Sequence, residues 1–343
     1  MEVKNPLPRS ISYLRIASFF ALSLALVIGG VLAGIRLTHA ASSEPELYQL
    51  RTDRSIWAYT GTGWEQLGSA NSQSAGIVAS PGNLYQLHLD GSIWRYTGTP
   101  LTGWQQYDTA NGSKAISISI AGKIYQSRNS DGKLLVFLGV GTHTAWHQLD
   151  TNQGQLITAG PEVIPTGTTC PVKEAIGPDT NGMLYAVRSN GVWFFCEKVW
   201  QQIDTYPATD VKATLNGKIY QLRGDSTNGD SIWQYTGGTS WQRIDNAQNP
   251  AAIRVDGNNT LYQLAHNGII WSYSGSNWTA FPANSDSSPV RNFKVSKSGD
   301  VFETLQDKSV WAYQAGAWQQ IDNSTNTLII TTDAGDTAVN FVG

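Results

Sequence analysis

The tryptophans of this chain recur at two positions of a repeated unit about 40 residues long. One copy, residues 84–108, contains an aromatic-Gln-Leu segment, an Asp-Gly pair, an Ile-Trp-x-Tyr segment and a Trp-Gln-x-x-Asp segment. The first position is filled by Trp57, Trp94, Leu135, Trp193, Trp233, Trp271 and Trp311. The second is filled by Trp64, Trp104, Trp146, Trp200, Trp241, Trp278 and Trp318. All 13 Trp residues of the chain fall in these positions, which predicts seven copies of one structural unit.

Each unit has the pattern of a small antiparallel sheet. Apolar and polar residues alternate along its segments, as in half-buried strands. Asp90-Gly91 favours a two-residue type I′ hairpin. That turn predicts that Leu87 faces Trp94 across the hairpin. It also predicts that Tyr85 faces Tyr96.

The ends of the repeat array indicate a closed ring. A short leading strand, residues 77–80, completes four strands in the second unit, as in a propeller blade. The first unit starts at Leu47 without a leading strand, and residues 328–332 after the last unit supply a spare one. Pairing of residues 328–332 with the first strand of the first unit would remove two exposed sheet edges. We therefore predict an all-β, seven-bladed β-propeller of four-stranded antiparallel blades, closed by the C-terminal strand; an open array is the alternative.

Residues 1–40 are predicted to target the chain for export. Lys4, Arg9 and Arg15 precede an uncharged, mostly apolar run of 20 residues, 16–35. Ala40-Ala41 marks a plausible signal-peptidase cleavage site. The run is also long enough to serve as a single transmembrane anchor helix. With either fate, the positive-inside rule places the propeller in an extracellular or cell-surface location.

The charge of the remaining chain excludes some partner classes. Residues 41–46 are a predicted short linker, and residues 47–343 the propeller. The whole chain carries −3, and residues 1–40 hold four basic residues and one acidic, so the remainder carries −6. We therefore expect no nucleic-acid partner, and membrane contact only through the N-terminal segment.

The two cysteines, Cys170 and Cys196, both belong to the fourth and longest unit. Cys170 lies in a Pro- and Gly-rich insertion, and Cys196 follows the strand that contains Trp193. In an exported protein this placement predicts a disulfide that ties the insertion to its blade. Two free buried thiols are the alternative.

Metal and catalytic signals are weak. His143 and His147 lie four residues apart without a third nearby ligand, so no metal or other cofactor is expected. Acidic residues recur at the end of the Trp-x-x-x-Asp segment: Asp108, Asp150, Asp204, Asp245 and Asp322. Such recurrence suggests a turn role, whereas a catalytic pair should be unique. We expect that the protein is not an enzyme.

Two recurring features are candidates for ligand binding. One is the set of Trp rings, which either form the core between blades or pack against the C–H face of a sugar. The other is a set of mid-strand glutamines, grouped with one Arg and one further Gln as candidate ligand-binding residues: Gln49, Gln86, Gln126, Gln221 and Gln263, with Arg95 or Gln234. The alternative is that the buried amides bridge neighbouring blades, because buried amides need hydrogen-bond partners.

The repeats LYQLHLDGSIWRYTGTPLTGW and IYQLRGDSTNGDSIWQYTGGTSW resemble the tectonin and tachylectin-like repeat propellers. The resemblance covers about residues 47–322. The Val-Trp-Gly-Val-Asn element common in tectonin repeats is absent, so no site residue is carried over. The resemblance implies a lectin-like, carbohydrate-binding module whose partners are glycans or cell-envelope components. A cell-surface scaffold for another protein is the alternative function, and a propeller hydrolase is a third.

Overall fold

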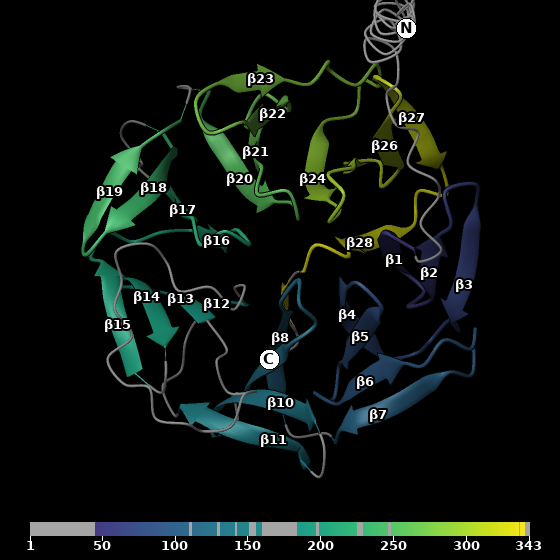
Figure 1. Cartoon of the computed structure of the whole chain (residues 1–343). Coiled ribbons are helices and arrows are strands. Elements are labelled where there is room, and N and C mark those ends of the chain that lie inside the picture. Colours follow the sequence, from purple (N-terminus) through teal and green to yellow (C-terminus); the bar gives the residue numbers. More distant parts are fainter. Residues whose placement is uncertain are drawn as a thin grey trace, which may run out of the picture. The chain divides into compact units, whose positions relative to one another are not determined.

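Seven antiparallel sheets stand like blades around a common centre (Figure 1). The computed structural model describes residues 45–109, 112–128, 131–140, 143–150, 156–159, 184–196, 199–224, 229–245, 248–335 and 337–339. The predicted signal peptide or anchor, its cleavage site at Ala40-Ala41, and Cys170 with the side chain of Cys196 lie outside this description. In the part of the chain that is described, no helix has the length and apolar character needed to cross a membrane.

The strands of each blade are given from the innermost to the outermost. Blade 1 contains β28 (Thr327–Thr332), β1 (Leu47–Arg51), β2 (Ile56–Tyr59) and β3 (Trp64–Gly68). Blade 2 contains β4 (Ser74–Ser80), β5 (Asn83–His88), β6 (Ile93–Tyr96) and β7 (Trp104–Asp108). Blade 3 contains β8 (Ser113–Ile118), β9 (Ile124–Arg128), β10 (Leu134–Val140) and β11 (His143–Asp150). Blade 4 contains β12 (Leu156–Ala159), β13 (Leu184–Arg188), β14 (Gly191–Cys196) and β15 (Val199–Asp204).

The last three blades follow the same plan. Blade 5 contains β16 (Asp210–Ala213), β17 (Ile219–Arg223), β18 (Ser231–Gly237) and β19 (Ser240–Arg243). Blade 6 contains β20 (Pro250–Val255), β21 (Leu261–Ala265), β22 (Ile270–Tyr273) and β23 (Trp278–Ala280). Blade 7 contains β24 (Val290–Val295), β25 (Val301–Leu305), β26 (Val310–Gln314) and β27 (Ala317–Asp322).

The ring is closed by the strand that the sequence predicted. β28 pairs antiparallel with β1, with Leu47 opposite Thr332 and Leu50 opposite Ile329. Blade 1 therefore combines three N-terminal strands with one from the C-terminal end of the chain. This pairing satisfies the edge that β1 would otherwise expose, and it rules out the open array.

One blade departs from the predicted four strands. After β28 the chain turns back, and β29 (Thr337–Val339) pairs antiparallel with β8, placing Ala338 opposite Ile116. Blade 3 thereby gains a fifth, innermost strand. The C-terminal segment thus joins blade 1 to blade 3 across the centre of the ring.

The hairpin of blade 2 differs from the predicted two-residue turn. His88 N donates to Ser92 O at 2.9 Å, so the loop holds three residues. Asp90 Oδ1 accepts hydrogen bonds from Ser92 N at 2.8 Å and Ser92 Oγ at 2.7 Å. Gly91 takes a φ of +79°, the left-handed residue that ends such a three-residue loop. Because the Asp side chain holds the turn through Ser92, only the glycine needs positive φ.

The longer loop shifts the pairing by one residue. Leu87 lies opposite Ile93, and Gln86 lies opposite Trp94. The predicted pairing of Leu87 with Trp94 was therefore wrong. In the four blades that have both, the recurring Gln and the first Trp lie opposite each other and share one face of the sheet.

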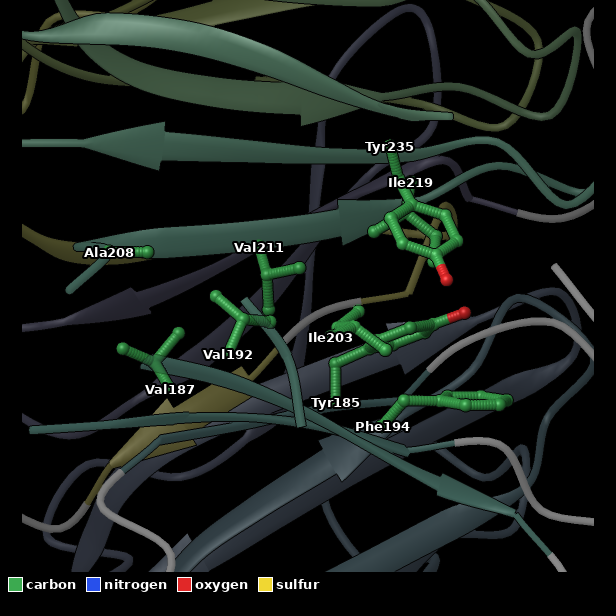
Figure 2. Packing of buried hydrophobic residues seen from close by; sticks show 9 residues of the cluster. All are labelled: Tyr185, Val187, Val192, Phe194, Ile203, Ala208, Val211, Ile219 and Tyr235. Carbon is green, nitrogen blue, oxygen red and sulfur yellow. The ribbon is translucent and has the colours of Figure 1, made fainter. Parts of the chain in front are cut away.

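The hydrophobic core is divided among the contacts between blades. The described residues hold seven buried clusters, one for each pair of neighbouring blades. Figure 2 shows the cluster between blades 4 and 5: Tyr185, Val187, Val192, Phe194, Ile203, Ala208, Val211, Ile219 and Tyr235. Each sheet buries both faces, and so its stability depends on its two neighbours.

Truncation after Asp322 removes β28 and is expected to destabilise the fold strongly, because it opens the ring and exposes the β1 edge. A fall in melting temperature of more than roughly 10 °C is expected by circular dichroism. Truncation after Gly335 is the control, because it removes only β29 and should have a smaller effect. Equal melting temperatures for the full chain and the shorter truncation would contradict closure as a source of stability.

Candidate functional site

The second Trp of each unit joins neighbouring blades. Trp64 Nε1 donates to the backbone oxygen of Ile321 at 2.8 Å, and Trp104 Nε1 donates to Leu67 at 2.9 Å. The corresponding bond, at 2.7–3.3 Å, is made by Trp146, Trp241, Trp278 and Trp318. In every blade this ring also packs against an aromatic residue of the adjacent strand, with centroids 4.9–5.4 Å apart. The second Trp of each unit therefore packs in the core between blades, which is one of the two roles predicted for the Trp rings.

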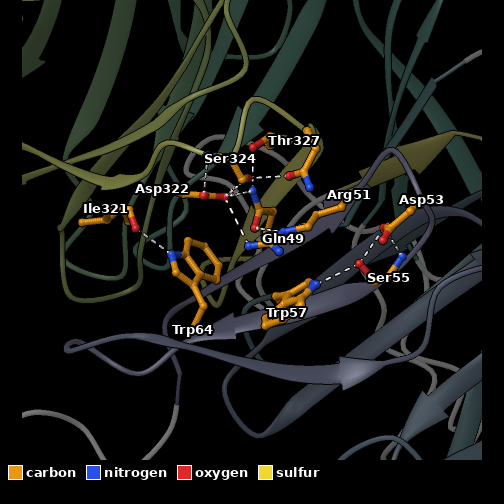
Figure 3. Close-up of polar contacts among 11 residues, drawn as sticks. Gln49, Arg51, Asp53, Ser55, Trp57, Trp64, Ile321, Asp322, Ser324 and Thr327 are labelled. Carbon is orange, nitrogen blue, oxygen red and sulfur yellow. Dashed lines mark hydrogen bonds and ion pairs between the residues drawn. The ribbon is translucent and has the colours of Figure 1, made fainter.

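A buried polar cluster joins the last blade to the first (Figure 3). Gln49 Nε2 donates to Asp322 Oδ2 at 2.6 Å and to Thr327 Oγ1 at 2.5 Å. Arg51 Nη2 lies 3.4 Å from the same Asp322 oxygen, and its guanidinium carbon lies 4.1 Å from the centre of the Trp57 ring. The side chains of Arg51 and Asp322 are 14% and 7% exposed. Asp322 is therefore half of an ion pair between blades, in addition to its turn role.

The same cluster recurs at two further interfaces. Its members are Asp108, Gln126 and Arg128 between blades 2 and 3, and Asp204, Gln221 and Arg223 between blades 4 and 5. The Arg to carboxylate distances are 2.9 and 2.7 Å. All five recurring glutamines are buried, at 0–3% exposure. Three of them, Gln49, Gln126 and Gln221, donate to a carboxylate of the neighbouring blade. Ligand binding by the recurring glutamines stays a prediction.

Arg95 and Gln234 lie on the opposite sheet face from the recurring Gln of their own blade. Arg95 lies opposite Tyr85, the residue before Gln86, and Gln234 lies opposite Tyr220, the residue before Gln221. Successive residues of a strand point to opposite faces. Arg95 Nη2 donates instead to Asn83 Oδ1 at 3.1 Å. Arg95 and Gln234 therefore do not share a sheet face with the recurring Gln of the same blade.

A carboxyl replaces the amide in blade 7. Glu303 lies opposite Trp311 at the Gln position and is 1% exposed. Pro282 occupies the Asp position of the preceding blade, so no acidic partner faces it there. Glu303 Oε1 accepts a hydrogen bond from Asn284 Nδ2. Burial raises the pKa of Glu303 to about 7.

The inner strands surround a pocket at the centre of the propeller. It is open to solvent on one side. Its walls come from β8, β12, β16, β20, β24 and β28, together with Ala334 and Gly335 from the turn before β29. Its polar and charged side chains are Ser117, Lys212, Arg254, Asp256, Lys294 and Thr332.

Three cations occupy one position in three successive blades. Each lies opposite the aromatic residue that precedes the Gln position, in the pairs Lys212–Tyr220, Arg254–Tyr262 and Lys294–Phe302. The same position in other blades is taken by Thr331, Val78 and Ser117. The register therefore places Lys212, Arg254 and Lys294 at one level of adjacent inner strands. We call these three residues the cationic arc.

Asp210 pairs with two members of the cationic arc. Lys212 Nζ lies 2.8 Å from Asp210 Oδ1, and Arg254 Nη1 lies 3.4 Å from Asp210 Oδ2. Arg254 Nη2 donates further to Asn292 Oδ1 at 3.2 Å. Asp256 also lines the pocket, but its carboxylate accepts hydrogen bonds within its own turn.

The cationic arc was not predicted from the sequence. Each of its members stands eight residues before an aromatic position, so alignment of units 5–7 on that position carries the signal. The arc is confined to three units, so it is absent from the pattern that most units share. Among the described residues, no group of three or more His, Cys, Asp or Glu side chains is placed to hold a metal ion.

No family model matches this chain, and no curated protein matches its sequence. Solved structures match its fold. YCF48 bound to D1 peptide is 12% identical, with a TM-score of 0.51 over 78% of this chain and 94% of that chain. A catalytically inactive virginiamycin B lyase from Staphylococcus aureus with quinupristin is 11% identical, with a TM-score of 0.51 over 80% and 98%.

The Aleuria aurantia lectin in complex with Fucα1-6GlcNAc is 16% identical, with a TM-score of 0.43 over 76% of this chain and 96% of that chain, a likeness too low to carry an argument. At these identities the comparisons establish the class of the protein, a seven-bladed β-propeller. They assign no ligand and no activity to it.

Asp322→Ala is expected to destabilise the protein by about 3–5 kcal/mol, because it leaves the buried Arg51 without its carboxylate. Urea denaturation would measure the loss. Asp131→Ala is the matched control, since it breaks an exposed pair with Lys133 that is worth about 0–1 kcal/mol. Equal losses in the two variants would contradict the structural role of the inter-blade pair.

Glu303→Gln is expected to stabilise the protein above neutral pH. The pKa of this carboxyl rises from 4.5 to about 7 on folding, so its contribution to stability is complete below pH 4.5 and is lost as the pH rises through 7. A shift of that size corresponds to roughly 3 kcal/mol. Urea denaturation should find the variant more stable than the wild type at pH 8, and by a smaller margin at pH 5. A difference independent of pH would count against this assignment.

Proposed function

We propose that this propeller is a non-catalytic binding module that holds a carbohydrate in its central pocket. The observation that carries the proposal is the mixed chemistry of the pocket wall. Ala213 and Val255 line the pocket beside the donors of the cationic arc. A sugar ring needs this combination, because its C–H face is apolar and its hydroxyls require fixed hydrogen-bond partners. The resemblance to tectonin-type repeats supports the same ligand class.

The carboxylates around the pocket favour binding over hydrolysis. Glycoside hydrolysis needs two carboxyl groups on either side of the scissile bond. Among the described residues that line the pocket, Asp256 is the one carboxylate, and it accepts hydrogen bonds from Asn258 N, Thr260 N and the Tyr262 hydroxyl. Asp210, beside the wall, pairs with two cations of the arc. Neither is placed as a free general acid or base.

We also propose that the propeller acts outside the cell. The basic, apolar and small-residue segments of residues 1–40 support export by a cleaved signal peptide or a retained anchor. A glycan of the cell envelope would be within reach in either arrangement. N-terminal sequencing of the mature protein distinguishes the two.

A glycan array probed with the wild type and with Ala334→Phe tests the proposed function. Ala334 lies in a turn at the pocket wall, so a phenyl ring there should fill the pocket while leaving the sheets in place. Binding of at least one glycan is expected for the wild type, with a loss of roughly tenfold or more in the variant. Ala317→Phe, on the exposed outer strand β27, is the control and should bind as the wild type does. No binder on the array, or equal binding by Ala334→Phe, would overturn the proposal.

Peptide binding is the second candidate function. It is favoured by the likeness, at a TM-score of 0.51, to a structure described as YCF48 bound to D1 peptide. Material from a cell-envelope extract retained on the immobilised propeller would distinguish the candidates. Loss of retention after protease treatment supports a peptide, and loss after periodate oxidation supports a glycan.

A further inference from the structure

We propose that the contact between blades 1 and 7, where the ring closes, is pH-sensitive, and that a proton on the Glu46 carboxyl stabilises it. Three segments meet at this contact: the residue before β1, the residue after β28, and the turn between β24 and β25. Each segment contributes one carboxyl group, on Glu46, Asp333 and Asp300. We call these three residues, together with Ser298 of the turn, the seam. The inference does not depend on the ligand of the central pocket.

Hydrogen bonds join the three segments directly. Asp333 N donates to the backbone oxygen of Glu46 at 3.2 Å, and Lys297 N donates to Asp333 Oδ1 at 2.7 Å. One residue before Asp333, the buried Thr332 hydroxyl donates to the backbone oxygen of Val295 at 2.6 Å. Thr332 and Val295 both line the central pocket. The seam therefore lies at the ends of two strands, β24 and β28, that form part of the pocket wall.

The geometry around the Ser298 hydroxyl requires a protonated carboxyl. Ser298 Oγ lies 2.9 Å from Glu46 Oε2, 2.9 Å from Asp300 Oδ2 and 2.7 Å from Ser296 Oγ. Each of these three contacts between oxygens needs one hydrogen atom. The two serine hydroxyls supply one hydrogen each, because a hydroxyl group has a single donor. The third hydrogen therefore comes from a carboxyl group, on Glu46 or on Asp300.

The electrostatics of the seam assign this proton to Glu46. Burial, the adjacent Asp300 carboxyl and the charge of Asp333 together raise the pKa of Glu46 to about 7. Burial also raises the pKa of Asp333, although the backbone N–H and the charge of Lys297 act in the opposite direction. A neutral Glu46 satisfies the hydrogen-bond count at Ser298 and avoids a further negative charge between the other two carboxylates.

Blade 6 presents another acidic group to the same turn of blade 7. A Cβ at Gly299 would stand 3.1 Å from Asp256 Oδ2. That carboxylate accepts a hydrogen bond from the Tyr262 hydroxyl at 3.1 Å. Loss of the Glu46 proton would thus add negative charge where several carboxylates already lie, and it would remove one of the three hydrogens that the Ser298 contacts need. Both effects weaken the seam.

The sign of the pH dependence follows from the pKa of Glu46. This pKa rises from 4.5 to about 7 when the seam forms. The contribution of the proton to stability is therefore complete below pH 4.5 and is lost as the pH rises through 7. Export of the chain, as proposed above, would expose the seam to the pH of the surroundings. The seam would be tight in acidic surroundings and looser in alkaline ones.

Hydrogen exchange of the full chain, measured by mass spectrometry at pH 6 and pH 8, tests the inference. The rates are corrected for the intrinsic pH dependence of amide exchange. Segments that contain Lys297 and Asp333 are then expected to open roughly tenfold more often at pH 8 than at pH 6. Segments from β16 and β17 of blade 5 are the internal reference and should keep their protection.

Two variants identify the titrating group. Glu46→Gln is expected to keep the seam protected at pH 8, because its amide is neutral and can donate a hydrogen to Ser298. Asp300→Asn is expected to move the transition to lower pH, because it removes the carboxyl beside Glu46.

Two further variants are controls. Glu65→Gln removes a carboxyl from an exposed position of β3 in blade 1, and it should leave the pH dependence of the seam unchanged. Glu303→Gln removes another carboxyl of blade 7 whose pKa is raised. Any effect of Glu303→Gln on global stability should appear equally in the seam and in the reference segments.

Equal protection of the seam at the two pH values would overturn the inference, and so would an unchanged pH dependence in Glu46→Gln. A loss of protection that is equal in the reference segments would also overturn it, because it reports global unfolding. If Glu46→Gln does not fold, Asp300→Asn decides, and a transition that stays at the same pH counts against the inference. None of these measurements uses a ligand, so their outcome is independent of the glycan array.

Discussion

The contact between the faces of neighbouring sheets is the interaction on which this molecule depends. No blade has a core of its own, because its buried residues belong to clusters shared with the blades on either side. At three of these contacts an Asp at the end of an outer strand pairs with an Arg and a Gln of the next blade, as Asp322 does with Arg51 and Gln49. Removal of one partner from such a buried pair leaves an uncompensated charge. Loss of one blade contact is therefore expected to destabilise the whole ring, and the closing strand β28 contributes to the stability of every blade.

The same contacts decide where a ligand has room to bind. The polar and aromatic residues that recur in most units are held between blades, where they contact each other. The centre is different, because the inner strands converge there and side chains of several blades line one space. Residues such as Lys212, Arg254 and Lys294 are not shared by all units, and for that reason they distinguish one side of the pocket. In this propeller the repeated residues build the scaffold, and the unrepeated ones define the candidate site.

Much of the fold could be predicted because its signals are local and repeated. The spacing of the tryptophans indicated seven units, and the spare segment at residues 328–332 indicated the closure seen in β28. The register of the blade 2 hairpin could not be obtained this way. Asp90-Gly91 fits both a two-residue and a three-residue loop, and the hydrogen bonds from Ser92 to Asp90 favour the longer one. β29 was also missed, because three residues without a repeat partner carry no periodic signal.

The number of units, the strand pattern within each and the closure of the ring could be inferred from the amino-acid sequence, because alternation and spacing are properties of neighbouring residues. The contacts between residues of different blades became visible only in the folded chain. Asp108 lies 18 residues before Gln126 and belongs to another blade, and Lys212, Arg254 and Lys294 are separated by about 40 residues each. Their proximity follows from the stacking of blades around one axis, which brings the same register position of successive inner strands together at the centre.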